Sequence, residues 1–228
     1  MTLTAWIDIL GATMQGRAPH FADSYREKHL SASPSGLREL MGCDDRVMYL
    51  ISEIVCLENL RDQHLLTDSD LCEHVKSLAH QIEMTETHEP LAMPNAPIDP
   101  RSLTATITAA FRYASRIYLC SLVPGFDRNQ PQVVQLLAKL TATLDLIPVT
   151  SENYDRSLVW VYLIGGSVAG PDAGFRHLLE DRCRMMGDMA TQGSWGRMKR
   201  VLDEVWRFGG DRSWRDVMRA NGWECLLI

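Results

Sequence analysis

Two adjacent aspartates, Asp44 and Asp45, are the strongest candidates for chemistry in this sequence. Paired carboxylates at the start of a helix can hold Mg²⁺ and, through it, a diphosphate group. Such a site needs a further acid three or four residues on, but the next positions are Arg46, Val47 and Met48. Favourable interaction with the helix dipole explains the pair without any metal. An all-helical, terpenoid-type enzyme is therefore only a remote alternative.

Other catalytic and metal-binding patterns are also missing from the sequence. A second diphosphate motif at Asn153 and Ser157 would need a carboxylate at the position that Val161 occupies. There is no Gly-x-Ser-x-Gly, no phosphate-binding loop and no dinucleotide-binding motif. The seven histidines form no pair at metal-binding spacing, and the Cys-Glu-His triplet at 72–74 points in three directions on a helix. We expect no enzyme activity, no metal site and no cofactor.

Methionine and tryptophan side chains are concentrated in the C-terminal third of the chain. Methionine adapts to irregular apolar volumes and is common in pockets for apolar ligands. The alternative is that these residues simply fill the hydrophobic core, and composition alone favours this alternative. If a ligand pocket exists, its candidate residues are Trp160, Met185, Met189, Met198, Trp206 and Met218.

Apolar residues at helical spacing predict the elements that would position these side chains. The predicted N-caps are Asp44, Thr67 with Asp70, Asp99 before a proline, and Ser194. The predicted helices cover residues 44–66, 68–85, 100–123, 131–147, 158–169, 172–190 and 195–208. No strand pattern is convincing. The sequence predicts an all-α fold, an irregular bundle of about nine to eleven helices.

One proline-rich segment, residues 88–100, interrupts the helical pattern. It could be a domain boundary, but the helices before it have no independent signature. We expect a mobile crossover loop inside one regulatory domain that covers residues 1–228. The longest apolar run, 158–169, has twelve residues, which is too few to cross a bilayer.

Charge and cysteine usage indicate an intracellular protein. Residues 1–100 carry 7 basic and 16 acidic residues, a balance of −9, whereas the remainder carries 16 and 13, a balance of +3. No basic stripe of the kind that binds nucleic acid is present. The six cysteines are scattered, without a pairing or chelating pattern, and are expected to be reduced and buried. The N-terminus lacks the basic region of a signal peptide.

Several motifs, taken in order along the chain, resemble a known family. The segment 160–169 resembles the W-x-L-x-I-x-G-x-x-A motif of the fungal-specific transcription factor regulatory domain, the second of its two common types. That domain follows a zinc binuclear-cluster finger in many ascomycete regulators. The other matching segments are 40–45, 51–54, 111–119, 202–206 and 214–218. Together they extend the resemblance from about residue 35 to the end of the chain.

The resemblance implies an all-α effector domain of a transcription regulator, in the nucleus and cytoplasm. Sterol-responsive members of the family bind sterol in this domain, and the present sequence resembles the developmental regulators of filamentous fungi more closely. The zinc finger needs six cysteines within about thirty residues, and those in this chain lie from 43 to 225. We therefore expect a regulatory fragment or a finger-less protein that does not itself bind nucleic acid.

Two binding functions remain open at this stage. The domain could sense a hydrophobic small molecule, sterol-like or another lipid, bound between the helices at 158–169, 172–190 and 195–208. Alternatively, it could be a ligand-free platform for homodimerisation or for a co-regulator protein. An apolar cavity would favour the first and an exposed apolar patch the second.

Overall fold

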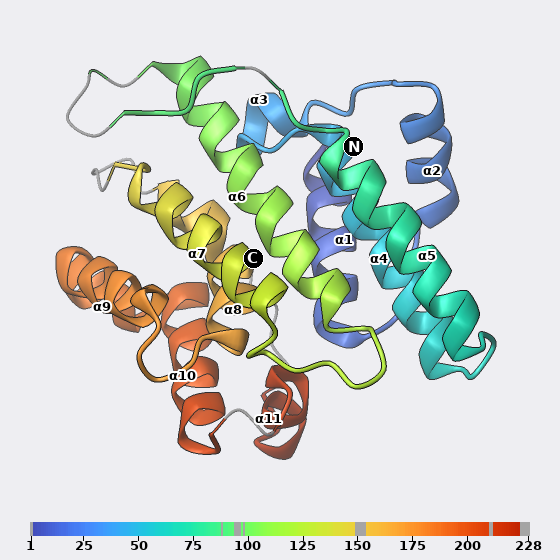
Figure 1. Ribbon diagram of the computed structural model, residues 1–228. Coiled ribbons are helices and arrows are strands. Elements are labelled where there is room, and N and C mark those ends of the chain that lie inside the picture. Colours follow the sequence, from blue (N-terminus) through green and yellow to red (C-terminus); the bar gives the residue numbers. More distant parts are fainter. Residues whose placement is uncertain are drawn as a thin grey trace.

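The regular elements of the chain are all helices. The computed structural model describes residues 2–87, 89–93, 97, 99–148, 154–209 and 212–223, apart from the side chain at 156. These residues contain eleven α-helices, two short 3₁₀ helices and no strand, which confirms the predicted all-α class (Figure 1). The elements are α1 (Thr2–Gln15), α2 (Ala22–Leu30), α3 (Leu37–Met41), α4 (Asp45–Asp62), α5 (Asp68–Glu83), α6 (Pro100–Cys120), α7 (Pro131–Asp145), η1 (Tyr154–Leu158), α8 (Val159–Val168), α9 (Gly174–Met186), η2 (Gly187–Thr191), α10 (Gly193–Arg207) and α11 (Trp214–Ala220).

Three of the predicted helix starts are confirmed by their capping side chains. Asp44 caps α4 by accepting a hydrogen bond from the backbone N–H two residues later. Thr67 and Asp70 form a reciprocal capping box at the start of α5. Asp99 caps α6, and Pro100 is the first residue of that helix. Each cap satisfies backbone N–H groups that have no partner inside the helix.

The C-terminal helices differ from the prediction. α10 begins at Gly193 with Gln192 at the N-cap position, so the predicted cap at Ser194 is wrong. The single helix predicted over 172–190 is two elements, α9 and η2. Gly187 breaks it with a φ of +56°, a conformation that glycine adopts without the steric cost of a Cβ atom.

Apolar periodicity does not predict the three N-terminal helices. α1 buries most of its faces, so it lacks the polar stripe that marks an amphipathic helix. Asp8 on α1 fixes the position of α2. Its carboxylate accepts hydrogen bonds from the backbone N–H groups of His20 (2.9 Å) and Phe21 (3.0 Å) and from the Tyr25 hydroxyl (3.1 Å).

α6 lies between two groups of helices (Figure 1). On one side it packs against α4 and α5, and on the other against α7 and α8. α1 and α2 pack on α4, while α10 packs on α8 and carries α11. The buried apolar side chains of both groups form one continuous hydrophobic cluster.

The centre of this cluster is an aromatic stack. The ring of Phe111 on α6 lies parallel to that of Trp160 on α8, with ring centres 5.9 Å apart. Trp6 meets Phe111 edge-on at 5.4 Å, and Tyr118 meets Trp160 edge-on at 6.1 Å. These contacts join α1, α6 and α8, so the central core is solidly packed.

The crossover between α5 and α6 runs past the N-terminal end of α6 (Figure 1). The contacts that hold its described part in place include an ion pair and a backbone hydrogen bond. Nη2 of Arg38 donates to both oxygens of the Glu89 carboxylate, at 2.9 and 2.7 Å. The backbone N–H of Ala92 donates to the Thr106 hydroxyl on α6 at 2.8 Å. Positions 88, 94–96 and 98 of the predicted crossover loop lie outside the described residues.

Candidate functional site

The six candidate ligand-binding residues lie in different environments. Trp160, Met198 and Met218 are buried in the hydrophobic cluster. Trp206 is half-buried, whereas the side chains of Met185 and Met189 are exposed by 66% and 44%. The structure therefore does not gather the six around a single cavity.

Trp160 is part of the structural core. Its side chain is fully buried, and its indole Nε1–H donates a hydrogen bond to the Thr13 hydroxyl at 2.9 Å. The polar edge of the ring is thus satisfied while both faces are packed. This position explains why the 160–169 motif begins with tryptophan, and it leaves the ring far from solvent.

Trp206 links α10 to α8. Its indole N–H donates to the backbone carbonyl of Gly166 at 2.8 Å, and the Arg176 guanidinium lies 4.3 Å from its ring centre. Gly166 permits this approach because a Cβ atom there would lie 2.4 Å from a methyl carbon of Leu202. The close packing of α10 on α8 therefore requires glycine at position 166, whereas Gly170 has open space around it.

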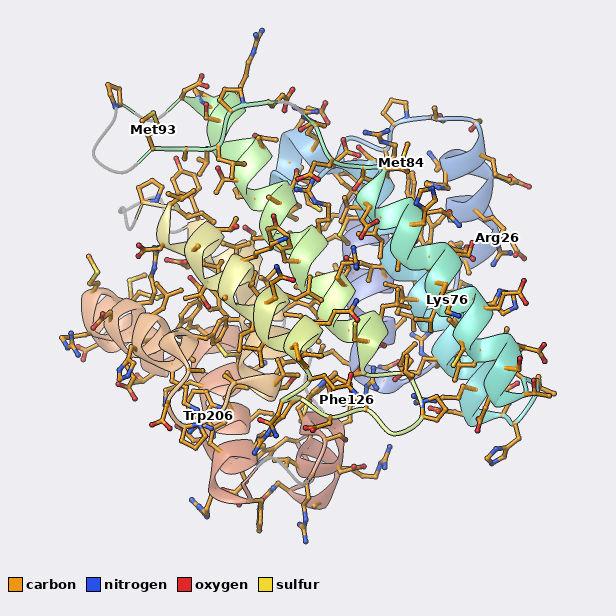
Figure 2. The ribbon with its side chains drawn as sticks, in the orientation of Figure 1. Arg26, Lys76, Met84, Met93, Phe126 and Trp206 are labelled. Carbon is orange, nitrogen blue, oxygen red and sulfur yellow. The ribbon has the colours of Figure 1, made fainter. Side chains whose placement is uncertain are left out.

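An open cavity of about 820 Å³ lies where the crossover meets α6, α7 and α9. We call it the crossover pocket. Its apolar walls include one of the six candidates, Met185, and Met93 extends from the crossover at its edge (Figure 2). The apolar lining residues are Pro90, Leu91, Ala92, Met93, Pro97, Leu103, Leu146, Ile147, Pro148, Leu178 and Met185. The volume is within the range of small-molecule sites.

A buried ion pair closes the back of the crossover pocket. Arg182 lines it and donates a hydrogen bond to the backbone carbonyl of Leu144 at 2.6 Å. Its Nη1 lies 3.5 Å from the Asp155 carboxylate, which also accepts a hydrogen bond from the Tyr162 hydroxyl at 2.7 Å. Burial raises the pKa of the Asp155 carboxyl, and the charge of Arg182 opposes that rise. The arginine charge is therefore compensated within the protein.

The rim of the crossover pocket is acidic. Asp99, Asp145 and Asp181 line it, and all three are exposed. Asp181 also pairs with Arg184 at 2.6 Å. A ligand with a carboxylate head would meet this set of like charges, whereas an uncharged apolar molecule would not.

Two further cavities contact α9 or η2. A groove of about 530 Å³ between α7 and α9 shares Asp145, Leu178 and Asp181 with the crossover pocket, so the two are adjacent. A separate cavity of about 350 Å³ is lined by Met189 and Trp195. The methionines at 185 and 189 therefore face different cavities.

A buried polar cluster joins α11 to the core, and the sequence analysis missed it. Arg215 donates bidentate hydrogen bonds to the Glu58 carboxylate at 2.6 and 2.7 Å. It also donates to the backbone carbonyl of Thr13 and to the Tyr118 hydroxyl, both at 2.7 Å. Tyr118 in turn donates to Glu58. Burial raises the pKa of Tyr118, so this hydroxyl remains a donor.

The aspartate pair has a structural role. Asp45 is buried, and its carboxylate accepts hydrogen bonds from the backbone N–H groups of Ser35 (2.7 Å) and Leu37 (3.4 Å). It therefore orients the chain entering α3 in addition to its place in the first turn of α4. No cluster of His, Cys, Asp and Glu able to hold a metal ion occurs among the described residues.

The cysteines of the described ranges are not joined by disulfides. The five described cysteines, at positions 43, 56, 72, 120 and 183, are free thiols, and Cys225 lies outside the described residues. Burial raises the pKa of Cys56 to about 11.

None of the helices in the described ranges is long and apolar enough to cross a membrane.

Comparison with curated proteins finds three transcription regulators. The chain is 50% identical to the transcriptional regulatory protein pro1 of Neurospora crassa, with 100% of the chain and 38% of that protein aligned. It is 23% identical to the ustiloxin B cluster transcription factor ustR of Aspergillus flavus, over 97% of the chain and 39% of that protein. It is also 23% identical to the transcription factor dibT of Pestalotiopsis microspora, over 98% and 38%.

The chain thus spans less than two-fifths of the length of these relatives, as the 38–39% coverage shows. No solved structure matches it. The model of the fungal-specific transcription factor domain matches residues 1–228. This family and these relatives are transcription regulators rather than enzymes, in agreement with the prediction of a non-catalytic chain. The chain belongs to the family of fungal-specific transcription factor domains.

Proposed function

We propose that this chain is the regulatory domain of a fungal transcription factor and that an uncharged apolar small molecule, bound in the crossover pocket, controls it. The observation that carries the proposal is an apolar cavity of about 820 Å³ beside a densely packed core. The relatives are transcription regulators, which supports action in the nucleus with entry from the cytoplasm. DNA contact is assigned to other parts of such a regulator, because this chain has no basic stripe.

The acidic rim selects the class of ligand. Three aspartates lie around the pocket, and Arg182 at its back is already paired with Asp155. No free cation remains among the described lining residues to hold a fatty-acid carboxylate. A neutral, sterol-like molecule meets no such repulsion and buries its apolar surface against leucine, isoleucine and methionine side chains.

Ligand binding would act by shifting a conformational population. The crossover forms one wall of the pocket, and helices α6, α7 and α9 form the others. A ligand that contacts both parts stabilises the arrangement in which they are close together. The shift cannot exceed the difference in ligand affinity between the two arrangements.

A protein partner is the second candidate occupant, and two exposed methionines beside the acidic rim favour it. Met93 is exposed by 72% and Met185 by 66%, and both border the same pocket. Exposed apolar groups around a hollow are typical of self-association or of a co-regulator contact. In that case Met93→Glu would abolish a dimer seen by size-exclusion chromatography with light scattering, and ergosterol would have no effect on melting.

A pair of adjacent tryptophan substitutions tests the ligand proposal. Leu178 lines the pocket, whereas its neighbour His177 is exposed and does not, so Leu178→Trp fills the cavity and His177→Trp is the matched control. Ergosterol should raise the melting temperature of the parent and of His177→Trp but not of Leu178→Trp. Oleate should have no effect on any of the three.

Two results would refute the ligand proposal. One is that no uncharged apolar compound raises the melting temperature of the parent protein. The other is that Leu178→Trp folds normally and still responds to ergosterol. Should Leu178→Trp unfold, Met185→Trp provides a second test, because that side chain is mostly exposed and also borders the cavity.

A further inference from the structure

A second pocket, of about 600 Å³, lies between the C-terminal part of α6, the loop from α6 to α7, and α11. We call it the α11 pocket. Figure 2 shows Phe126, which lines it, on that loop above the C-terminal helices. No residue of this pocket lines the crossover pocket, so the two sites are separate.

The charge of the α11 pocket is opposite to that of the crossover pocket. Four arginines and two carboxylates line it, which gives a formal balance of +2. Glu58 is fully engaged by Arg215, and Asp127 accepts two hydrogen bonds from Asn129, at 2.8 and 3.0 Å. The charged lining residues are Arg61, Arg128, Arg212, Arg215, Glu58 and Asp127.

Two of these arginines have no carboxylate partner in the part of the chain that the structure describes. Among the described residues, Arg128 and Arg212 form no ion pair. Arg128 donates only to the backbone carbonyl of Gly209, and the Arg212 guanidinium lies 4.5 Å from the ring centre of Phe208. Burial and the nearby positive charge of Arg128 lower the pKa of Arg176. Within the described residues, the charges of Arg128 and Arg212 at this rim are therefore not balanced by an ion pair.

The floor of the same pocket is apolar. Ile117, Ile164, Val168 and Trp214 line it, and all four belong to the buried core. Their positions are set by packing within α6, α8 and α11 and do not depend on a ligand. The site thus combines a fixed apolar floor with guanidinium groups at its mouth, an arrangement that suits a ligand with two chemically different ends.

We propose that the α11 pocket binds a small organic anion, in which an acidic head group meets Arg128 and Arg212 and an apolar body lies on the isoleucine and tryptophan floor. Guanidinium groups present planar pairs of N–H donors that match carboxylate or phosphate oxygens. The proposal concerns a different site and a different class of ligand from the crossover pocket, so it does not depend on the function proposed above.

The test uses the purified chain and three probes in isothermal titration calorimetry. The probes are 1-naphthoate, its uncharged analogue 1-naphthamide, and inorganic sulfate. Arg212→Gln removes one rim charge, and Arg219→Gln is the matched control on α11, because Arg219 is 79% exposed and lies outside the pocket. Naphthoate should bind the parent and Arg219→Gln equally well. It should bind Arg212→Gln about tenfold more weakly, as expected for the loss of one charged hydrogen bond.

Naphthamide and sulfate should bind at least tenfold more weakly than naphthoate, because each satisfies only one half of the site. Equal binding of naphthoate and naphthamide would show that the arginines do not select an anion and would overturn the proposal. Binding of sulfate as tight as that of naphthoate would overturn the role of the apolar floor. An equal loss in Arg212→Gln and Arg219→Gln, or no binding of naphthoate to the parent, would also refute it.

Discussion

Replacing Arg215 by methionine should destabilise the fold by about 3 kcal/mol, because it leaves the Glu58 carboxylate buried without its main partner. Glu58 is 2% exposed and receives both of its guanidinium hydrogen bonds from this one residue. Breaking a buried pair on one side costs about 3–5 kcal/mol. We expect the lower end of that range because Arg61 remains 3.5 Å from the carboxylate.

The assay is urea unfolding followed by far-ultraviolet circular dichroism, with the free energy of unfolding extrapolated to water. Arg219→Met, on the same helix but exposed, should change that free energy by less than about 0.5 kcal/mol. The double variant Arg215→Met with Glu58→Gln should be more stable than Arg215→Met alone, because the unpaired charge is removed together with its partner.

Strict additivity of the two changes would refute the argument. It would mean that the Arg215 side chain contributes only packing. It would also mean that the Glu58 carboxylate becomes hydrated or pairs with another cation when the arginine is lost. A value below about 1 kcal/mol for Arg215→Met would also refute it, since it would show that Glu58 is not held in a low-dielectric environment.

Two further substitutions test the packing, and an alkylation experiment tests the pKa of the Cys56 thiol. Trp160→Ala should lower the free energy of unfolding by about 3–5 kcal/mol, because it empties the stack with Phe111; a melting temperature within a degree or two of the parent would contradict this. Gly166→Ala should destabilise in the same urea assay by about 1–3 kcal/mol, because its Cβ would clash with Leu202; an unchanged midpoint would refute it. Cys56 should alkylate slowly at pH 8, with about one thiolate per thousand, and faster as pH rises toward its pKa of about 11, as measured by mass spectrometry; rapid alkylation at pH 8 would contradict that pKa.

The helices could be predicted from sequence because the signals that define them are local. Thr67 and Asp70 lie one turn apart and cap α5 without help from the rest of the fold. The family could be recognised for a similar reason. Motif residues such as Trp160 lie at core positions, and the motifs are recognised from the type of each residue and from its order along the chain. α1 could not be found this way, because a helix buried on most faces carries no amphipathic stripe.

The functional sites could not be derived from sequence, because they depend on long-range geometry. Glu58 and Arg215 are 157 residues apart, and each alone resembles a charge on a solvated helix face. On the continuous helix predicted over 172–190, Met185 and Met189 would share one face. The break at Gly187 separates them, so one borders the crossover pocket and the other the cavity near Trp195.

Helix α6 connects the two pockets and acts as a rigid element between them. Leu103 near its start lines the crossover pocket and Tyr118 near its end lines the α11 pocket, about 22 Å apart along the helix axis. α6 has no internal glycine or proline, so a tilt at one end is carried to the other without a hinge. If occupancy of one pocket tilts this rod, thermodynamic reciprocity requires that each ligand change the affinity of the other by the same factor. A neutral ligand and an anion would then jointly determine the conformation of the domain, although they are chemically unrelated and never in contact.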